Sequence, residues 1–158
     1  MSCNVYLSLG SNSGDRTAFL EAAVRRIALL GAVRVSAPYH NEPDGFESSA
    51  PFINLAAVLT LEERVTEDGA TALLRRIKTI ERELSSMPHR NPDGSYRDRE
   101  IDIDIVAVDG LTMETPELTL PHPRAAQRDF VVTPLRMLGI DTDALLRRPD
   151  NAERQHGS

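Results

Sequence analysis

The amino-acid sequence predicts an α+β sandwich, in which helices pack on one face of a mainly antiparallel sheet. Two observations support this prediction. Short segments alternate apolar and polar residues, which is typical of strands, and two longer segments repeat apolar residues at the helical period. Along the chain, these segments follow the order strand, helix, strand, strand, helix, strand, which suits a sheet covered by helices.

The first strand and the first helix are expected before Gly31. Asn4 to Leu9 alternates as a strand, and the stretch from Gly10 to Asp15 is expected to break it, with Asp15 as a candidate helix N-cap. That stretch is either a binding loop or an ordinary turn. Apolar residues follow at helical spacing, and Gly31 is expected to end the helix.

The next two strands flank a long polar loop. Val33 to Tyr39 and Phe52 to Leu61 are predicted strands, and residues 40–51 between them form a loop long enough to act as a lid or a binding loop. Phe52 and Asn54 share one face of the later strand. An aromatic ring beside an amide suits a flat heterocycle, because the ring stacks while the amide offers a donor and an acceptor; core packing beside a solvated Asn is the alternative.

The second helix, Thr66 to Leu84, carries an acid within its apolar stripe. Glu81 lies four residues after Ile77, about 40° around the helix from it. A buried carboxylate needs partners, so Glu81 is expected to meet a ligand hydroxyl or a neighbouring loop, unless the last turn protrudes into water. The loop that follows, 85–100, holds three arginines and is a candidate phosphate clamp; a plain solvated loop is the alternative.

The segment from Ile101 to Ile105 is central to the functional interpretation. It alternates strictly, so the isoleucines are expected to face the core while Asp102 and Asp104 face the other side together. Their Cα atoms would be roughly 7 Å apart, and two like charges at that distance repel by about 2 kcal/mol at an effective dielectric of about 20. A Mg²⁺ ion bound between the two carboxylates would replace this repulsion with attraction, since hard divalent cations prefer carboxylate oxygens. The alternative is that the two aspartates simply lie on the solvent-exposed face of an antiparallel sheet.

The segment after this strand holds a turn, a constrained histidine and a last helix. Asp109-Gly110 predicts a hairpin, with Leu111 to Met113 returning antiparallel. His122 stands between two prolines and precedes Arg128, a combination suited to phosphates or a nucleotide, although a lone histidine is more often structural. Phe130 to Leu138 is expected to form a short final helix.

The composition excludes several classes of protein. The net charge of −6 argues against a general nucleic-acid binder, which would present a basic stripe. A single cysteine, Cys3, excludes an internal disulfide framework and a cysteine-based zinc site. No apolar run approaches the length of a membrane span and no charged-then-apolar leader is seen, so we expect a cytoplasmic protein without a membrane partner.

Several of these features coincide in order along the chain. They are Gly10-Ser11-Asn12, Phe52-Ile53-Asn54, Ile80-Glu81, Asp98-Arg99-Glu100-Ile101-Asp102-Ile103-Asp104, and Leu120-Pro121-His122 with Arg128-Asp129-Phe130. Together they resemble the motifs of the hydroxymethyl-dihydropterin pyrophosphokinases of folate biosynthesis, over roughly Val5 to Leu138. The resemblance implies a ferredoxin-like sandwich, which we expect to occupy residues 1–146. The last dozen residues, 147–158, are polar and are expected to form a disordered tail. It also implies transfer of pyrophosphate from ATP to the hydroxymethyl group of a reduced pterin, with release of AMP.

The resemblance further implies a role for each matching residue. Asp102 and Asp104 would hold two Mg²⁺ ions, with ATP as co-substrate, and Arg99 would be catalytic beside them. Asn54 would hydrogen-bond the pterin, which Phe52 and Phe130 would sandwich. The residues implied on the ATP side are Lys78, Glu81, Arg99, His122 and Arg128. The two long loops would be lids over both substrates.

The expected partners are therefore ATP and a reduced pterin, bound by a monomer that takes no nucleic acid. Two other classes of function stay open at this point. A ferredoxin-like regulatory module would bind ATP without releasing AMP when pterin is added. A partner-binding structural domain would need only a solvated strand at the two aspartates, and it would not bind ATP in a Mg²⁺-dependent way.

Overall fold

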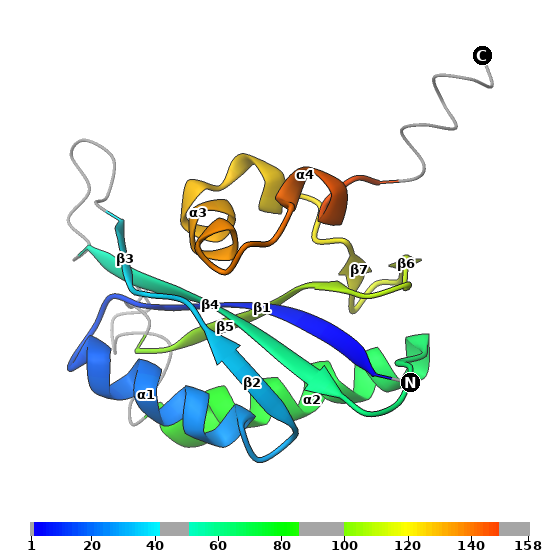
Figure 1. The fold of residues 1–158 in the computed structure, drawn as a ribbon. Helices are drawn as coiled ribbons and strands as arrows, with labels where there is room; N and C mark the ends of the chain where they lie inside the picture. Colours follow the sequence, from blue (N-terminus) through cyan, green and yellow to red (C-terminus); the bar gives the residue numbers. More distant parts are fainter. Residues whose placement is uncertain (1, 42–50, 86–99, 149–158) are drawn as a thin grey trace.

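The computed structural model describes residues 2–41, 51–85 and 100–148. Its main antiparallel sheet has the strand order β2-β4-β1-β5, and the short β3 also pairs with β4 (Figure 1). With the connecting helices, the chain order is that of a ferredoxin-like sandwich, so the predicted fold class is confirmed. The strands of this sheet are β1 Cys3–Ser11, β2 Ala32–Val35, β3 Tyr39–Asn41, β4 Phe52–Leu61 and β5 Asp102–Val108.

Strand β1 lies between β4 and β5 and pairs with both. Its odd-numbered apolar residues are fully buried on one face, while Ser8 and Gly10 lie on the other. The strand continues through Gly10 and Ser11, which were expected to belong to the following turn. Pairing with Asn54 and Ile53 of β4 holds this end of β1 in the sheet, a non-local contact that outweighs the local turn signal.

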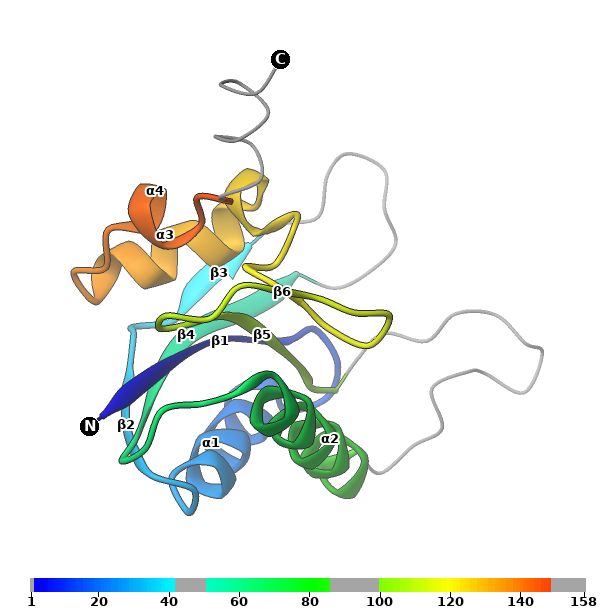
Figure 2. The ribbon, with the colours of Figure 1, turned by 90° about the vertical axis from the view of Figure 1, so that its right-hand side faces the viewer.

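Two helices, α1 (Arg16–Ile27) and α2 (Glu67–Leu84), lie side by side on one face of the sheet (Figures 1 and 2). Asp15 is the N-cap of α1, as predicted, and its side chain accepts a hydrogen bond from the backbone N of Ala18 at 3.1 Å. The buried residues beneath both helices include Leu7, Leu20, Ala23, Ile27, Leu59, Ile77, Ile103 and Ile105. The core that supports β5, the strand of Asp102 and Asp104, is therefore shared by both helices.

Helix α1 ends at Ile27, four residues before the predicted stop at Gly31. Gly31 serves another purpose, because a Cβ placed on it would lie 2.6 Å from the backbone oxygen of Thr60. A glycine here lets the connection between α1 and β2 pass close to β4.

The opposite face of the sheet is partly covered by α3 (Asp129–Met137) and α4 (Thr142–Leu145) (Figure 1). The predicted final helix is thus present as α3, but the expectation that all helices share one face is wrong. A second buried cluster explains the difference, because β1, β4 and β5 also present apolar residues on this face. The cluster includes Tyr6, Ala56, Val58, Val106, Val131, Val132 and Leu135.

Two other predicted elements are corrected. The predicted strand from Val33 to Tyr39 is split into β2 and β3, because the Ser36 hydroxyl accepts a hydrogen bond from the backbone N of Ala56 at 2.9 Å in place of a regular ladder contact. The predicted turn at Asp109-Gly110 is present, with Gly110 at φ +68°. The returning segment makes one bridge, Val108 with Leu111, and then forms a separate sheet. The remaining elements are β6 Met113–Glu114, β7 Thr119–Leu120 and a 3-10 turn at Ala125–Gln127.

The end of the described chain is held against the fold. Arg148 donates hydrogen bonds to the backbone oxygen of Pro121 at 2.9 Å and to the Glu114 carboxylate at 3.3 Å. Cys3, the first residue of β1, is buried. Within the described ranges, no helix combines the length and the apolar character needed to cross a membrane.

Candidate functional site

Three neighbouring strands form the floor of the candidate site. Gly10 of β1 pairs with Asn54 of β4 on one side and with Asp102 of β5 on the other. In the next row on the same face, Ser8 pairs with Ala56 and with Asp104. At about 4.8 Å per strand, the Cα atoms of Asn54 and Asp102 are roughly 10 Å apart. The residue between them is Gly10, which has no side chain.

Asp102 and Asp104 share the face opposite the isoleucine core, as the alternation predicted. Both are partly buried. Burial raises the pKa of Asp104, and the nearby charge of Asp102 raises it further. The positive charges that act in the other direction come from Lys78, His122 and Arg128. Lys78, His122 and Arg128, from three separate segments, therefore lie close enough to the two aspartates to influence the pKa of Asp104.

Lys78 and Glu81 of α2 hold the outer edge of β5. The Glu81 carboxylate accepts a hydrogen bond from the backbone N of Ile103 at 2.5 Å, and Lys78 Nζ donates to the backbone oxygen of the same residue at 3.0 Å. Lys78 also pairs with Glu81 at 3.1 Å. Glu81 is only 7 % exposed, and burial raises its pKa, against the opposing effects of Lys78 and of the Ile103 hydrogen bond. The buried acid predicted on α2 thus has partners in the strand between the two aspartates.

His122 and Arg128 lie beside the β5 end of the site. The backbone N of His122 donates to the oxygen of Val106 at 2.7 Å, which ties the histidine to β5. Its Nδ1 accepts from the backbone N of Arg124 at 3.1 Å, so a neutral ring carries its proton on Nε2. Burial lowers the pKa of His122. The Arg128 guanidinium lies 5.7 Å from the centre of the Phe130 ring, close enough for a cation–π contact.

Asn54 provides an unused buried acceptor on the β4 side. It is only 4 % exposed, and its Oδ1 has no hydrogen-bond partner in the described part of the chain. An unpaired buried oxygen is unfavourable unless a ligand or water completes it. A Cβ on Gly10 would lie 2.6 Å from the Asn54 Nδ2 atom and 3.4 Å from a Phe52 ring carbon. The missing side chain of Gly10 therefore makes room for the Asn54 amide and for the ring beside it.

Ile103 and Arg16 were given no part in the site from the sequence, and Gly10 was named only within the motif Gly10-Ser11-Asn12. Gly10 was assigned to a turn, although a glycine inside a strand pattern is a signal for close approach. Ile103 acts through its backbone, which no sequence pattern reveals. Arg16, in the first turn of α1, donates to the backbone oxygen of Pro51 at 2.6 Å and so holds the chain just before Phe52.

Part of the predicted site lies outside the described residues. This concerns Arg99, the other two loop arginines, Arg90 and Arg97, and most of the first long loop. The described residues bring Asp102, Asp104, Lys78, Glu81, His122 and Arg128 into one electrostatic group. Asn54 and Phe52 join them across Gly10.

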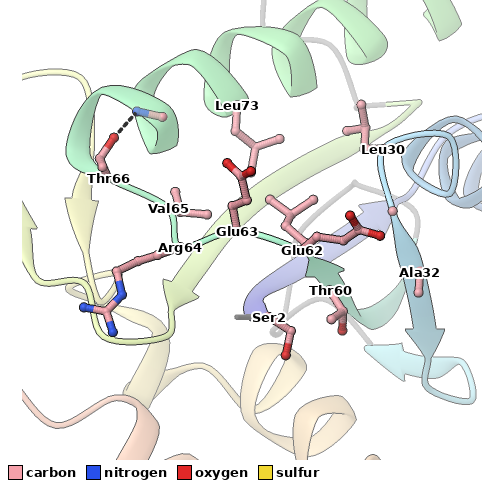
Figure 3. A pocket seen from close by; sticks show the side chains of 13 residues that line it. Ser2, Leu30, Ala32, Thr60, Glu62, Glu63, Arg64, Val65, Thr66 and Leu73 are labelled. Atoms are coloured by element: carbon pink, nitrogen blue, oxygen red, sulfur yellow. Dashed lines mark hydrogen bonds between the residues drawn. The ribbon is translucent and has the colours of Figure 1, made fainter.

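A pocket of about 660 Å³ lies at the other end of the β1–β4 pair (Figure 3). Its lining includes Leu30, Leu61 and Leu73, with Glu62 and Glu63 on the turn before α2. Gly10 and Cys3 are separated by seven residues of strand, or about 24 Å, so this pocket is remote from the aspartates. Its charged lining residues are Glu62, Glu63 and Arg64, with no histidine and no pair of aspartates, and we place the candidate site at Asp102 and Asp104 instead.

Comparisons with known proteins point to one family. Residues 6–139 match the family model described as 7,8-dihydro-6-hydroxymethylpterin-pyrophosphokinase (HPPK). A 2-amino-4-hydroxy-6-hydroxymethyldihydropteridine pyrophosphokinase of Porphyromonas gingivalis is 43% identical over 136 residues, which cover 83% of this chain and 87% of that protein. Proteins of the same name from Bacillus subtilis and Aquifex aeolicus are each 35% identical, covering 82% and 83% of this chain and 74% and 77% of their own lengths.

Proposed function

The chain belongs to the 7,8-dihydro-6-hydroxymethylpterin-pyrophosphokinase family, and from that premise we propose how its residues perform the reaction. The enzyme is an ATP-dependent diphosphotransferase of folate biosynthesis. It transfers pyrophosphate from ATP to the hydroxymethyl group of 6-hydroxymethyl-7,8-dihydropterin and gives the pterin diphosphate and AMP. In bond terms, the pterin hydroxyl oxygen loses its proton and forms a bond to the β-phosphorus, and the bond from that phosphorus to the α–β bridging oxygen breaks, so that the bridging oxygen leaves with AMP.

The observation that carries the residue assignment is the row Asn54, Gly10, Asp102 across three strands. It puts an unpaired amide oxygen and a carboxylate on one face, with no side chain between them. A substrate that spans this row would present a polar heterocycle to Asn54 and its reacting hydroxyl toward Asp102. This matches the two ends of a hydroxymethyl pterin.

An enzyme that uses ATP generally works with Mg²⁺, and the residues present suit that ion. Asp102 and Asp104 offer carboxylate oxygens on one face, and the described part of the chain holds no cluster of three or more metal-ligating side chains. Mg²⁺ is commonly bound by one or two carboxylates, with phosphate and water as its other ligands. We propose that the two aspartates hold two ions, which would neutralise the phosphate charge and favour ionisation of the attacking hydroxyl.

On the pterin side, we assign hydrogen bonding to Asn54 and stacking to Phe52 and Phe130. The Asn54 amide can both donate and accept, which suits the amide-like edge of a pterin. Discrimination by such a buried polar group is strong, because a ligand without the complementary atoms leaves the group unpaired.

On the nucleotide side, we assign His122 and Arg128 to the phosphates of ATP, and Arg99 to catalysis beside them. With its proton on Nε2, a neutral His122 still offers one hydrogen-bond donor. Arg128 offers a planar charged group suited to phosphate oxygens. We assign Lys78 and Glu81 to this side through β5, to which both are hydrogen-bonded, and not through direct contact with the nucleotide. Alignment and charge neutralisation by such groups are the main requirements of phosphoryl-type transfer.

Replacement of Asp102 tests the assignment. Asp102→Ala should abolish AMP formation from ATP and the reduced pterin, since one half of the metal-binding pair is lost, while the circular dichroism spectrum and melting temperature stay close to those of the wild type. Glu117→Gln, which removes an exposed ion pair with Arg75, is a matched control and should turn over normally. Normal turnover by Asp102→Ala would refute the assignment.

We also propose that the enzyme acts as a monomer in the cytoplasm. Asn54 and Asp102, which we assign to the pterin and the metal, lie in one row of a single sheet, so the proposed site does not require a residue from a second copy. Light scattering after gel filtration should give a mass near 17.5 kDa. A stable dimer would contradict this part of the proposal.

A further inference from the structure

Strand β5 is an edge strand of the main sheet, and the contacts along its outer edge help to fix the positions of both aspartates. Edge strands expose backbone N–H and C=O groups that have no neighbouring strand to bind. At Ile103, both groups are instead bound by side chains of α2, the N–H by Glu81 and the oxygen by Lys78. Residues three apart on a helix are neighbours, so one turn of α2 substitutes for the missing strand.

Ile103 is the residue between Asp102 and Asp104, and its own side chain is fully buried. Its two backbone hydrogen bonds to α2 and its side chain in the core together fix the orientation of this part of β5. The two aspartate side chains leave the strand immediately before and after it, toward the other face. Their separation therefore depends on how firmly Ile103 is held.

We propose that Lys78 and Glu81 are positioning residues, which set the geometry of the Asp102–Asp104 metal pair by clamping Ile103. This inference rests on the proposed function, because it requires the two aspartates to bind the metal. Lys78 and Glu81 would then affect metal binding indirectly, by holding the backbone of β5, and would not bind the metal themselves. Partners that orient metal ligands commonly change metal affinity roughly 10- to 100-fold when they are replaced.

The test measures metal binding and nucleotide binding separately. Glu81→Leu removes the acceptor for the Ile103 N–H, and Lys78→Met removes the donor to the Ile103 oxygen. Mn²⁺ binding in the presence of ATP, followed by electron paramagnetic resonance, should weaken roughly 10- to 100-fold in both variants. The affinity for AMP without divalent ions, measured by calorimetry, should stay within about twofold, and hydrogen exchange of the Ile103 amide should become faster.

Two kinds of control separate positioning from general destabilisation. Glu81→Gln keeps an oxygen that can accept from Ile103, so it should retain Mn²⁺ affinity to within about threefold. Ile77→Val loosens the packing of the same helix without touching the clamp; it should lower the melting temperature and leave Mn²⁺ binding unchanged. If Glu81→Leu does not fold, the partly exposed Lys78→Met carries the same test.

Each outcome decides between the interpretations. If the wild type binds Mn²⁺, Asp102→Ala does not, and Glu81→Leu and Lys78→Met bind it with unchanged affinity, the positioning role is overturned while the proposed function stands. A loss of AMP affinity as large as the loss of Mn²⁺ affinity would also overturn it, and would indicate direct nucleotide contact. If the wild-type protein with ATP does not bind Mn²⁺, the proposed function fails and the clamp has no metal to position.

Discussion

The lack of a side chain at Gly10 should control pterin binding, and Gly10→Ala tests this directly. The added Cβ would lie 2.6 Å from the Asn54 Nδ2 atom, whereas unbonded carbon and nitrogen atoms normally stay more than 3 Å apart. Asn54 is 4 % exposed, so its amide has little free space into which to move. We therefore expect the amide to turn away from its present position and the protein to lose about 1–3 kcal/mol of stability by overpacking.

The effect on pterin affinity follows from the hydrogen bonds that a displaced amide gives up. Two neutral hydrogen bonds at about 0.5–1.5 kcal/mol each amount to about 1–3 kcal/mol, or roughly a 5- to 150-fold weaker pterin complex. Binding of ATP should change by less than about twofold, because the phosphate groups are assigned to the β5 side. Calorimetric titration of pterin into the protein saturated with a non-hydrolysable ATP analogue measures the first quantity, and titration of the analogue alone measures the second.

Gly31→Ala is a matched control at the other end of the sheet. Its added Cβ would also lie 2.6 Å from a neighbour, the backbone oxygen of Thr60, so it imposes a similar steric conflict far from the aspartates. It should lower the melting temperature and leave pterin affinity unchanged. The reasoning is wrong if Gly10→Ala binds pterin as well as the wild type does, or if Gly31→Ala weakens pterin binding equally.

Further predictions concern charge, pH and metal. Burial lowers the pKa of His122 from 6.5, so the unfolded chain takes up more protons than the folded chain just below that pH. The free energy of unfolding should therefore fall as the pH drops through 6.5. Calorimetry across pH 5 to 8 should show a smaller fall in His122→Gln than in the wild type. Burial raises the pKa of Glu81 from 4.5, so the contribution of Glu81 to the free energy of unfolding should be largest below pH 4.5 and should decline as the pH rises through the pKa of the folded protein. Denaturant titrations of the wild type and of Glu81→Gln should therefore differ in their pH dependence, and the same pH dependence in both would contradict this. Arg128→Met should raise the KM for ATP by roughly 10- to 100-fold, since a charge-assisted hydrogen bond contributes about 1.5–3 kcal/mol, and should affect the KM for pterin less. Chelation with EDTA should stop AMP release and added Mg²⁺ should restore it; turnover in EDTA would contradict the metal assignment.

The features that the sequence predicted well are those fixed by local periodicity. Alternation from Ile101 to Ile105 placed both aspartates on one face, because the strand repeat of two residues does not depend on the rest of the fold. The helical repeat likewise put Glu81 within a buried stripe, and the requirement that a buried acid have partners was met by Lys78 and Ile103. The roles of the individual site residues remain proposals.

The features that the sequence did not predict depend on contacts between distant segments. The extension of β1 through Gly10 follows from pairing with Asn54, and the split after β2 follows from the Ser36 hydroxyl reaching Ala56. Helix α3 has a clear apolar repeat, but nothing local to it says which face of the sheet it will cover. The bond from Arg16 to Pro51 spans 35 residues and leaves no periodic signal.

The central place of β1 has a consequence for the choice of acceptor alcohol. Because Asn54 and Asp102 are paired to the same residue of one strand, the distance between their Cα atoms is set by two strand spacings and does not depend on any side-chain rotamer. The sheet thus fixes the backbone distance between the residue proposed to bind the pterin ring and the residue proposed to bind metal at the site of transfer. A pterin with its alcohol on a longer or shorter arm should still dock its ring, yet it should hold the oxygen out of line with the phosphorus.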